Sequence, residues 1–229
     1  MAASFTSQVG TLIAKDLRRE LRTGEILATT LSFAVLLTVI FAFAFFVGDE
    51  TVSIVFPGIT WVAITFTGTL VITRTFSQET ASGCLRALAL IPGTDQSLYV
   101  AKLAINLLFM FAFELLLLPL LSLAFSVDLT AHLAGYLLVV GLGTVGYAAL
   151  GTLTSAMLVH NRLRDVLLPI VLYPLAVPLL IAGVKSTRIL FEGGTIADLS
   201  NWLKIMGGMD VLFLVAGWAL FGWVLEAIE

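Results

Sequence analysis

Long apolar runs, each bounded by charged or turn-forming residues, dominate the chain. A helix that crosses about 30 Å of hydrocarbon needs about 20 mostly apolar residues. Six runs reach or approach that length: 26–47, 51–73, 103–127, 133–159, 166–184 and 211–225. The last has only fifteen residues between Asp210 and Glu226, so it needs a few positions from 205–209 or from the C-terminal side to cross. The pattern predicts an all-α, polytopic membrane protein with six transmembrane helices.

The composition supports this class. Of 229 residues, 59% are hydrophobic and 12% charged, whereas soluble domains carry about 25% charged residues. The net charge of −3 argues against a nucleic-acid partner, which would need a clustered basic surface. The single cysteine, Cys84, excludes an intramolecular disulfide and a cysteine-rich metal site.

The distribution of Lys and Arg predicts the orientation. Nine of the twelve basic residues precede the first run or lie in the second-to-third and fourth-to-fifth connections. Basic residues in short loops are retained in the cytoplasm. Both termini are therefore expected to be cytoplasmic.

Residues 1–25 form a predicted cytoplasmic helix, separate from a transmembrane domain over 26–229. Apolar residues recur at three- and four-residue spacing, and basic residues occupy the other side. The apolar set is Val9, Leu12, Ile13, Leu17 and Leu21. Asp16 and Glu20 interrupt this arc. We expect an amphipathic helix along the cytoplasmic headgroups; a solvated helix that docks on a partner protein would show the same pattern.

The connection between the second and third runs, 74–102, is the longest between spans on the cytoplasmic side. Its composition predicts a helix continuing through Glu79, a break at Gly83 and a short apolar helix over 85–91 that Pro92 stops. Two interpretations fit this segment: either its apolar face rests on the membrane, or it docks on a cytoplasmic subunit.

Two features stand out within the spans. Glu114 lies twelve residues after Lys102, roughly 18 Å into the membrane. It is either a functional polar site in a cavity or subunit interface, or a protonated carboxyl with a structural hydrogen bond. Pro169, Pro174 and Pro178 each remove a backbone hydrogen bond and are expected to bend the fifth span, for motion or for packing alone.

Several blocks carry a family resemblance: 57–63 at the entry of the second span, 76–79 and 83–88 after it, and 164–174 and 177–182 in the fifth. The chain resembles the CcmB family over nearly its whole length. These proteins are the membrane subunits of the bacterial cytochrome c maturation ABC transporter. The resemblance implies an ABC-2-like exporter permease in the bacterial inner membrane that pairs with itself and works with the ATPase subunit CcmA and the small membrane partners CcmC and CcmD.

The resemblance also implies a division of labour. The chain has no GxxxxGK[ST] phosphate loop, so it is not expected to be an enzyme, and ATP would bind the partner subunit. Segment 74–92, here called the coupling segment, is the expected contact with that subunit. Within it the resemblance implies Phe76, Glu79 and Leu85 as contacts and Gly83 as the turn.

The resemblance leaves two possibilities for what is transported. The family handles haem, either as the transported molecule or through release of a haem chaperone. His132 and His160 are predicted near opposite membrane faces, so neither is assigned as a haem ligand. A membrane assembly scaffold and, less favoured, a secondary transporter are the alternatives; the latter would need paired ionisable residues or an inverted repeat.

Overall fold

The structure, a computed structural model, describes residues 4–45, 49–82, 95–159, 161 and 163–226. Over those residues the secondary structure is entirely helical. The helices are α1 (Phe5–Thr23), α2 (Glu25–Ala44), α3 (Asp49–Ser82), α5 (Asp95–Phe125), the short 3-10 turn η1 (Thr130–His132), α6 (Leu133–Met157), α7 (Arg164–Phe191) and α8 (Ser200–Glu226). Six of them are long and apolar enough to cross a membrane. The predicted fold class and six spans are confirmed.

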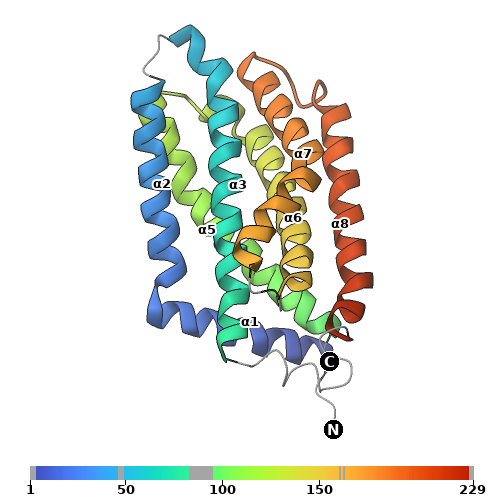
Figure 1. Ribbon diagram of the computed structural model, residues 1–229. Coiled ribbons are helices and arrows are strands. Elements are labelled where there is room, and N and C mark those ends of the chain that lie inside the picture. The colour runs from blue at the N-terminus through green and yellow to red at the C-terminus, as the bar shows by residue number, and fades with distance from the viewer. Residues whose placement is uncertain (1–3, 46–48, 83–94, 160, 162, 227–229) are drawn as a thin grey trace.

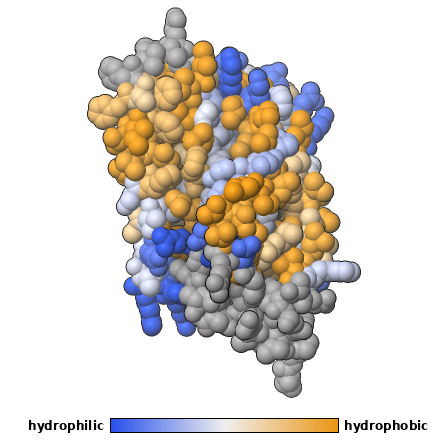
Figure 2. All heavy atoms as spheres, in the orientation of Figure 1, coloured by the Kyte–Doolittle hydropathy of each residue, from blue (hydrophilic) through white to orange (hydrophobic). Residues whose placement is uncertain are grey.

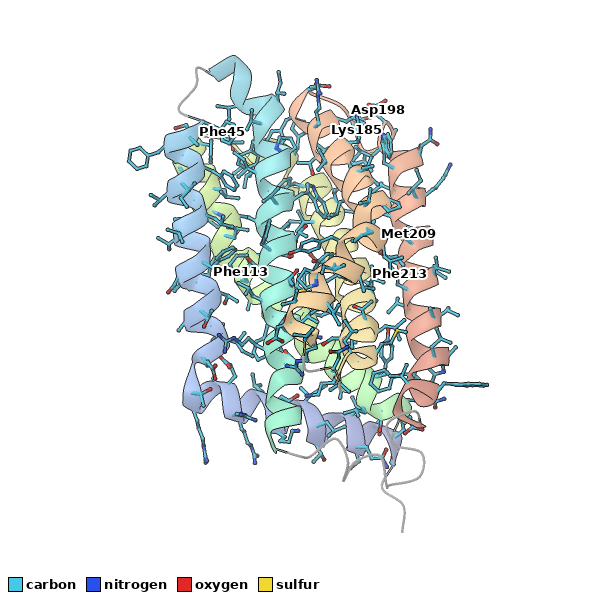
Figure 3. The ribbon with its side chains drawn as sticks, viewed as in Figure 1. Phe45, Phe113, Lys185, Asp198, Met209 and Phe213 are labelled. Atoms are coloured by element: carbon cyan, nitrogen blue, oxygen red, sulfur yellow. The ribbon has the colours of Figure 1, made fainter. Side chains whose placement is uncertain are left out.

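The six long helices form a bundle, and α1 lies across one end of it (Figure 1). Helix α6 is central, because it packs against α3, α5, α7 and α8. Both α1 and the C-terminal part of α8 lie at the same end, which we call the α1 end. The opposite end carries Lys185 and Asp198 (Figure 3).

The outer surface of the bundle is apolar. Hydrophobic residues cover much of the face between the hydrophilic residues near its two ends (Figure 2). Phe43 of α2 and Val215 of α8 are 82% and 61% exposed. A continuous apolar surface of this kind suits lipid and would be a liability in water.

Several helices run past the predicted spans. Helix α5 begins at Asp95 and α7 continues to Phe191. The largest difference is α8, which begins at Ser200 and not near Val211, so Asp210 lies inside the helix. A charge-free run is too strict a criterion for a span, because a helix tolerates a carboxyl that faces protein instead of lipid.

Trp61 shows why glycine is required in the interior. Its buried indole fills the space beside Gly143 of α6 and Gly183 of α7, where an added Cβ would overlap the ring. Its Nε1–H donates to the hydroxyl of Thr187 (3.0 Å). One side chain of α3 therefore joins three helices, with its polar atom satisfied.

Candidate functional site

Helix α1 packs on the bundle through apolar residues of its arc, and the two acidic residues that interrupt the arc add polar contacts. The apolar residues are Val9, Leu12, Ile13 and Leu17. Asp16 accepts a 2.7 Å hydrogen bond from the Lys102 ammonium of α5, whose side chain is 2% exposed. Glu20 is 2% exposed and accepts from the backbone N–H of Leu27 (2.9 Å), a free donor in the first turn of α2. Leu21, the last residue of the predicted apolar arc, is 74% exposed, and its neighbour Glu20 takes the inward place.

The corner between α1 and α2 depends on Gly24. Its φ of +60° lies in the left-handed region, and its N–H donates to the carbonyl of Glu20 (2.7 Å). A residue with a Cβ adopts this conformation only at a cost. At its other end, α1 reaches α8, where the Phe5 and Trp218 rings lie 6.1 Å apart. Helix α1 thus crosses the bundle from α8 to α2.

An open groove of about 800 Å³ lies beside α1 and is lined by Lys15, Arg18, Arg19 and Arg22 among others. Positive charge therefore gathers along α1 away from its attached face. This is the distribution expected of a helix that meets anionic headgroups or an acidic protein surface.

The C-terminal part of α3 reaches the same end and is tied to two neighbouring helices. Arg74 pairs with Glu25 of α2 (2.7 Å). Arg164, at the start of α7, donates to the backbone carbonyl of Thr73 (3.4 Å). A displacement of this part of α3 would therefore act directly on α2 and α7.

The predicted coupling residues continue from this point. Phe76 and Glu79 lie in the last turns of α3, whereas Gly83 and Leu85 fall outside the described residues. Their proposed role as ATPase contacts stays a prediction.

Hydroxyl and amide groups form a polar layer inside the bundle around α6. Tyr147 donates to the backbone carbonyl of Thr65 (3.1 Å) and lies 2.8 Å from the Thr69 hydroxyl, which in turn donates to Tyr173 (3.3 Å). Asn106 of α5 donates to Thr152 of α6 (3.0 Å). Such pairs fix which helix faces which in a bundle whose surroundings are as apolar as its core.

Glu114 lies on α5 and faces α6. It is 4% exposed, and its Oε1 accepts a hydrogen bond from the hydroxyl of Thr144. It is eleven residues from the end of α5 at Phe125, about 16 Å along the helix axis. Its carboxyl is thus directed toward protein at mid-membrane depth.

Asp210 is a second buried carboxyl, at the edge of the sixth charge-free run. It is 5% exposed on α8. Neither of its carboxyl oxygens has a hydrogen-bond partner among the described residues. The extension of the sixth run over 205–209, one of the two that the sequence left open, is the one that puts Asp210 inside α8.

The three prolines lie within one continuous helix, α7. Pro174 and Pro178 are exposed and Pro169 is partly exposed, so they lie mainly on the outer side of the bundle. The predicted bend and its role in motion stay predictions. His132, in η1, is exposed, and His160 falls outside the described residues.

Six candidate spans, a polar layer around a central helix and a basic helix across one end define a polytopic membrane protein. A family model described as "CcmB protein" matches residues 7–222. The chain belongs to the CcmB family.

Curated relatives agree with this assignment over most of their length. The chain is 30% identical over 210 residues to "Heme exporter protein B" of Paracoccus denitrificans, covering 89% of this chain and 91% of that protein. It is 26% identical over 200 residues to the protein of the same name from Haemophilus influenzae, covering 87% and 89%. A third, from Rhodobacter capsulatus, is 26% identical over 182 residues, covering 80% and 83%.

Proposed function

We propose that this chain is the membrane permease subunit of a haem-exporting ABC transporter for cytochrome c maturation in the bacterial inner membrane. The observation that carries the proposal is the family match over residues 7–222, together with relatives named "Heme exporter protein B". The chain pairs with a second copy of itself and with an ATPase subunit, CcmA in this family, alongside CcmC and CcmD. Hydrolysis in the ATPase drives haem export or release of a haem-loaded chaperone.

The α1 end supports a coupling role. The coupling segment begins at Arg74, which pairs with Glu25 of α2, and Thr73 beside it accepts from Arg164 of α7. A push from an ATPase subunit on this segment would reach α2, α3 and α7 together. The basic groove beside α1 lies at the same end, so we place this end in the cytoplasm, as the positive-inside rule expects.

The first experiment tests the contact with the ATPase. Glu79 and Leu85 are replaced together by alanine, and the ATPase subunit that copurifies is quantified. Loss of two contacts worth about 1 kcal/mol each would weaken binding about thirtyfold. The matched control replaces Asp128 and Leu133, an exposed acidic residue and an exposed leucine at the opposite end, and should leave binding unchanged. Unchanged binding of the first variant would remove the coupling segment from the interface.

A second experiment separates a permease from a scaffold or a secondary carrier. Spin labels on exposed positions of α2 and α7, Leu36 and Val177, report the distance between these helices in the assembled complex. A permease should change this distance when the ATPase binds or hydrolyses ATP. An ATPase that copurifies without moving these helices would favour an assembly scaffold, and absence of any associated ATPase would favour a secondary carrier.

A further inference from the structure

Asp210 lies in the interior of a membrane span, where a carboxyl without a hydrogen-bond partner has its highest free-energy cost. It is ten residues into α8, about 15 Å along the axis from Ser200, near the middle of the candidate span 200–224. It is 5% exposed, so neither lipid nor bulk water reaches it in this arrangement. Its neighbours Met209 and Phe213 also pack against the core (Figure 3).

The carboxyl is pressed against the backbone of α6. Its Oδ1 lies so close to Gly146 that a methyl group at that position would overlap it, and the Leu179 side chain of α7 borders the same spot. Glycine at 146 is therefore what admits the carboxyl into the seam between α6 and α8. An alanine there would leave no room for it.

Glu114 provides the contrast within the same bundle. Thr144 donates to Glu114, whereas the described residues offer no donor to either oxygen of Asp210. Thr144 and Gly146 are two positions apart, or about 200° around the helix, so the two carboxyls lie on opposite sides of α6. Only one of the two has its hydrogen bond.

The other ionisable side chains described on the helices packed against α8 lie at other levels of the bundle or contact other groups. On α6 and α7, the hydroxyls of Tyr136, Tyr147 and Tyr173 turn to threonines of α3. On α5, Tyr99 lies against Gly217 and Asp95 lies near Gly222, both farther along α8. The charged residues that remain are Lys102, paired with Asp16, Arg164 and Asp165 at the α1 end, and Lys185 and Arg188 near the opposite end of α7.

An ionised carboxylate without a partner in such a place would be very unfavourable. We propose that Asp210 is a proton-binding site in the seam between α6 and α8. The carboxyl keeps its proton while the seam is closed and releases it to water when the helices separate. Closing the seam takes the proton back, so opening and closing of this seam are linked to proton release and uptake.

The first test uses dicyclohexylcarbodiimide, an apolar reagent that reacts with protonated carboxyls in membranes and leaves a stable N-acylurea adduct. Mass spectrometry of the treated full-length protein in its membranes should find the adduct on Asp210. Above the pH at which the carboxyl ionises, the protonated fraction and the labelling should fall about tenfold per pH unit. Absence of an adduct on Asp210 at about pH 6, with the reagent reacting elsewhere in the membrane, would overturn the proposal.

The second test asks whether the seam follows the proton. Spin labels at the exposed positions Met157 of α6 and Trp223 of α8 report the separation of the two helices. Raising the pH should widen the distance distribution of the parent protein, and Asp210→Asn, which cannot ionise, should abolish the response. Glu114→Gln is the matched control and should retain it. An identical pH response in Asp210→Asn would refute the proposal.

Both readouts are independent of haem and of the ATPase. A chain that does not transport haem could still show both results. Negative results in both tests would not contradict the proposed transport function. If Asp210→Asn does not assemble, the labelling of the parent protein still decides whether the site binds a proton.

Discussion

The buried ion pair between Asp16 and Lys102 makes a quantitative prediction for the attachment of α1. Its atoms are 2.7 Å apart, and the side chains are 11% and 2% exposed. Removing one partner of a buried pair typically costs about 3–5 kcal/mol, whereas replacing both by apolar residues is often neutral. We therefore expect Asp16→Leu to weaken the docking of α1 by about 3 kcal/mol or more.

The reverse single change should cost less. In Lys102→Met the Asp16 carboxylate keeps Lys15, 3.4 Å away and 41% exposed, so a cost of about 1–3 kcal/mol is expected. In the double variant Asp16→Leu/Lys102→Met, α1 should dock nearly as well as in the parent. The coupling energy between the two positions should therefore be several kcal/mol. Lys15→Met is the matched control, because an exposed pair contributes less than about 1 kcal/mol.

Hydrogen exchange of the α1 amides in the detergent-solubilised protein measures this docking directly. A loss of 3 kcal/mol should accelerate exchange about 150-fold, up to the limit set by the freely undocked helix. Exchange in α2 should change much less, since α2 is a separate candidate span. If Asp16→Leu exchanges like the parent, or if the double variant loses as much as the two single variants added together, the ion pair does not hold α1.

The membrane orientation, the corner at Gly24 and the contact between Thr195 and Asp198 can each be tested separately. In a cysteine-free background, a cysteine at Asp49 should be labelled from the periplasm and one at Ser82 should not; the reverse pattern would invert the orientation. Gly24→Ala should accelerate exchange in α1 about fivefold, because its φ of +60° costs a side chain about 1 kcal/mol. The backbone N–H and the hydroxyl of Thr195 hold the pKa of Asp198 below its ordinary value, so this contact stabilises the protein at neutral pH and is lost as the pH falls through that lowered pKa. Thr195→Val should raise the pKa of Asp198 in a carboxyl NMR titration, and an unchanged pKa would show that the backbone donor alone sets it.

The number of spans could be predicted from the sequence because the length of an apolar run indicates a helix that crosses the membrane. Position 210 shows where that signal ends. A carboxyl in the middle of an apolar run resembles the end of a span. Only the packing shows that Gly146, 64 residues earlier, leaves room for this carboxyl on the neighbouring helix. That information is tertiary, and periodicity within one helix does not contain it.

The N-terminal helix gives a second case. Its amphipathic pattern was visible, but Asp16 and Glu20 counted as flaws in it. In the structure they add polar contacts to the apolar packing of α1, because Lys102 and the N–H of Leu27 meet them in the fold. Local amphipathicity predicts that a helix lies on a surface. The surface on which α1 lies is determined by the partners of the acidic residues within its apolar arc.

The attachment of α1 has a consequence for biosynthesis. Asp16 and Lys102 are 86 residues apart, so at 5–20 residues per second the ribosome needs roughly 4–17 s to supply the lysine after the aspartate. The contact of Phe5 waits longer still, for Trp218 near the end of the chain. During that interval the first helix carries an acidic residue that has not met its partner on α5. An N-terminal fragment that ends before α5 should therefore insert its first spans but leave α1 undocked and open to proteases.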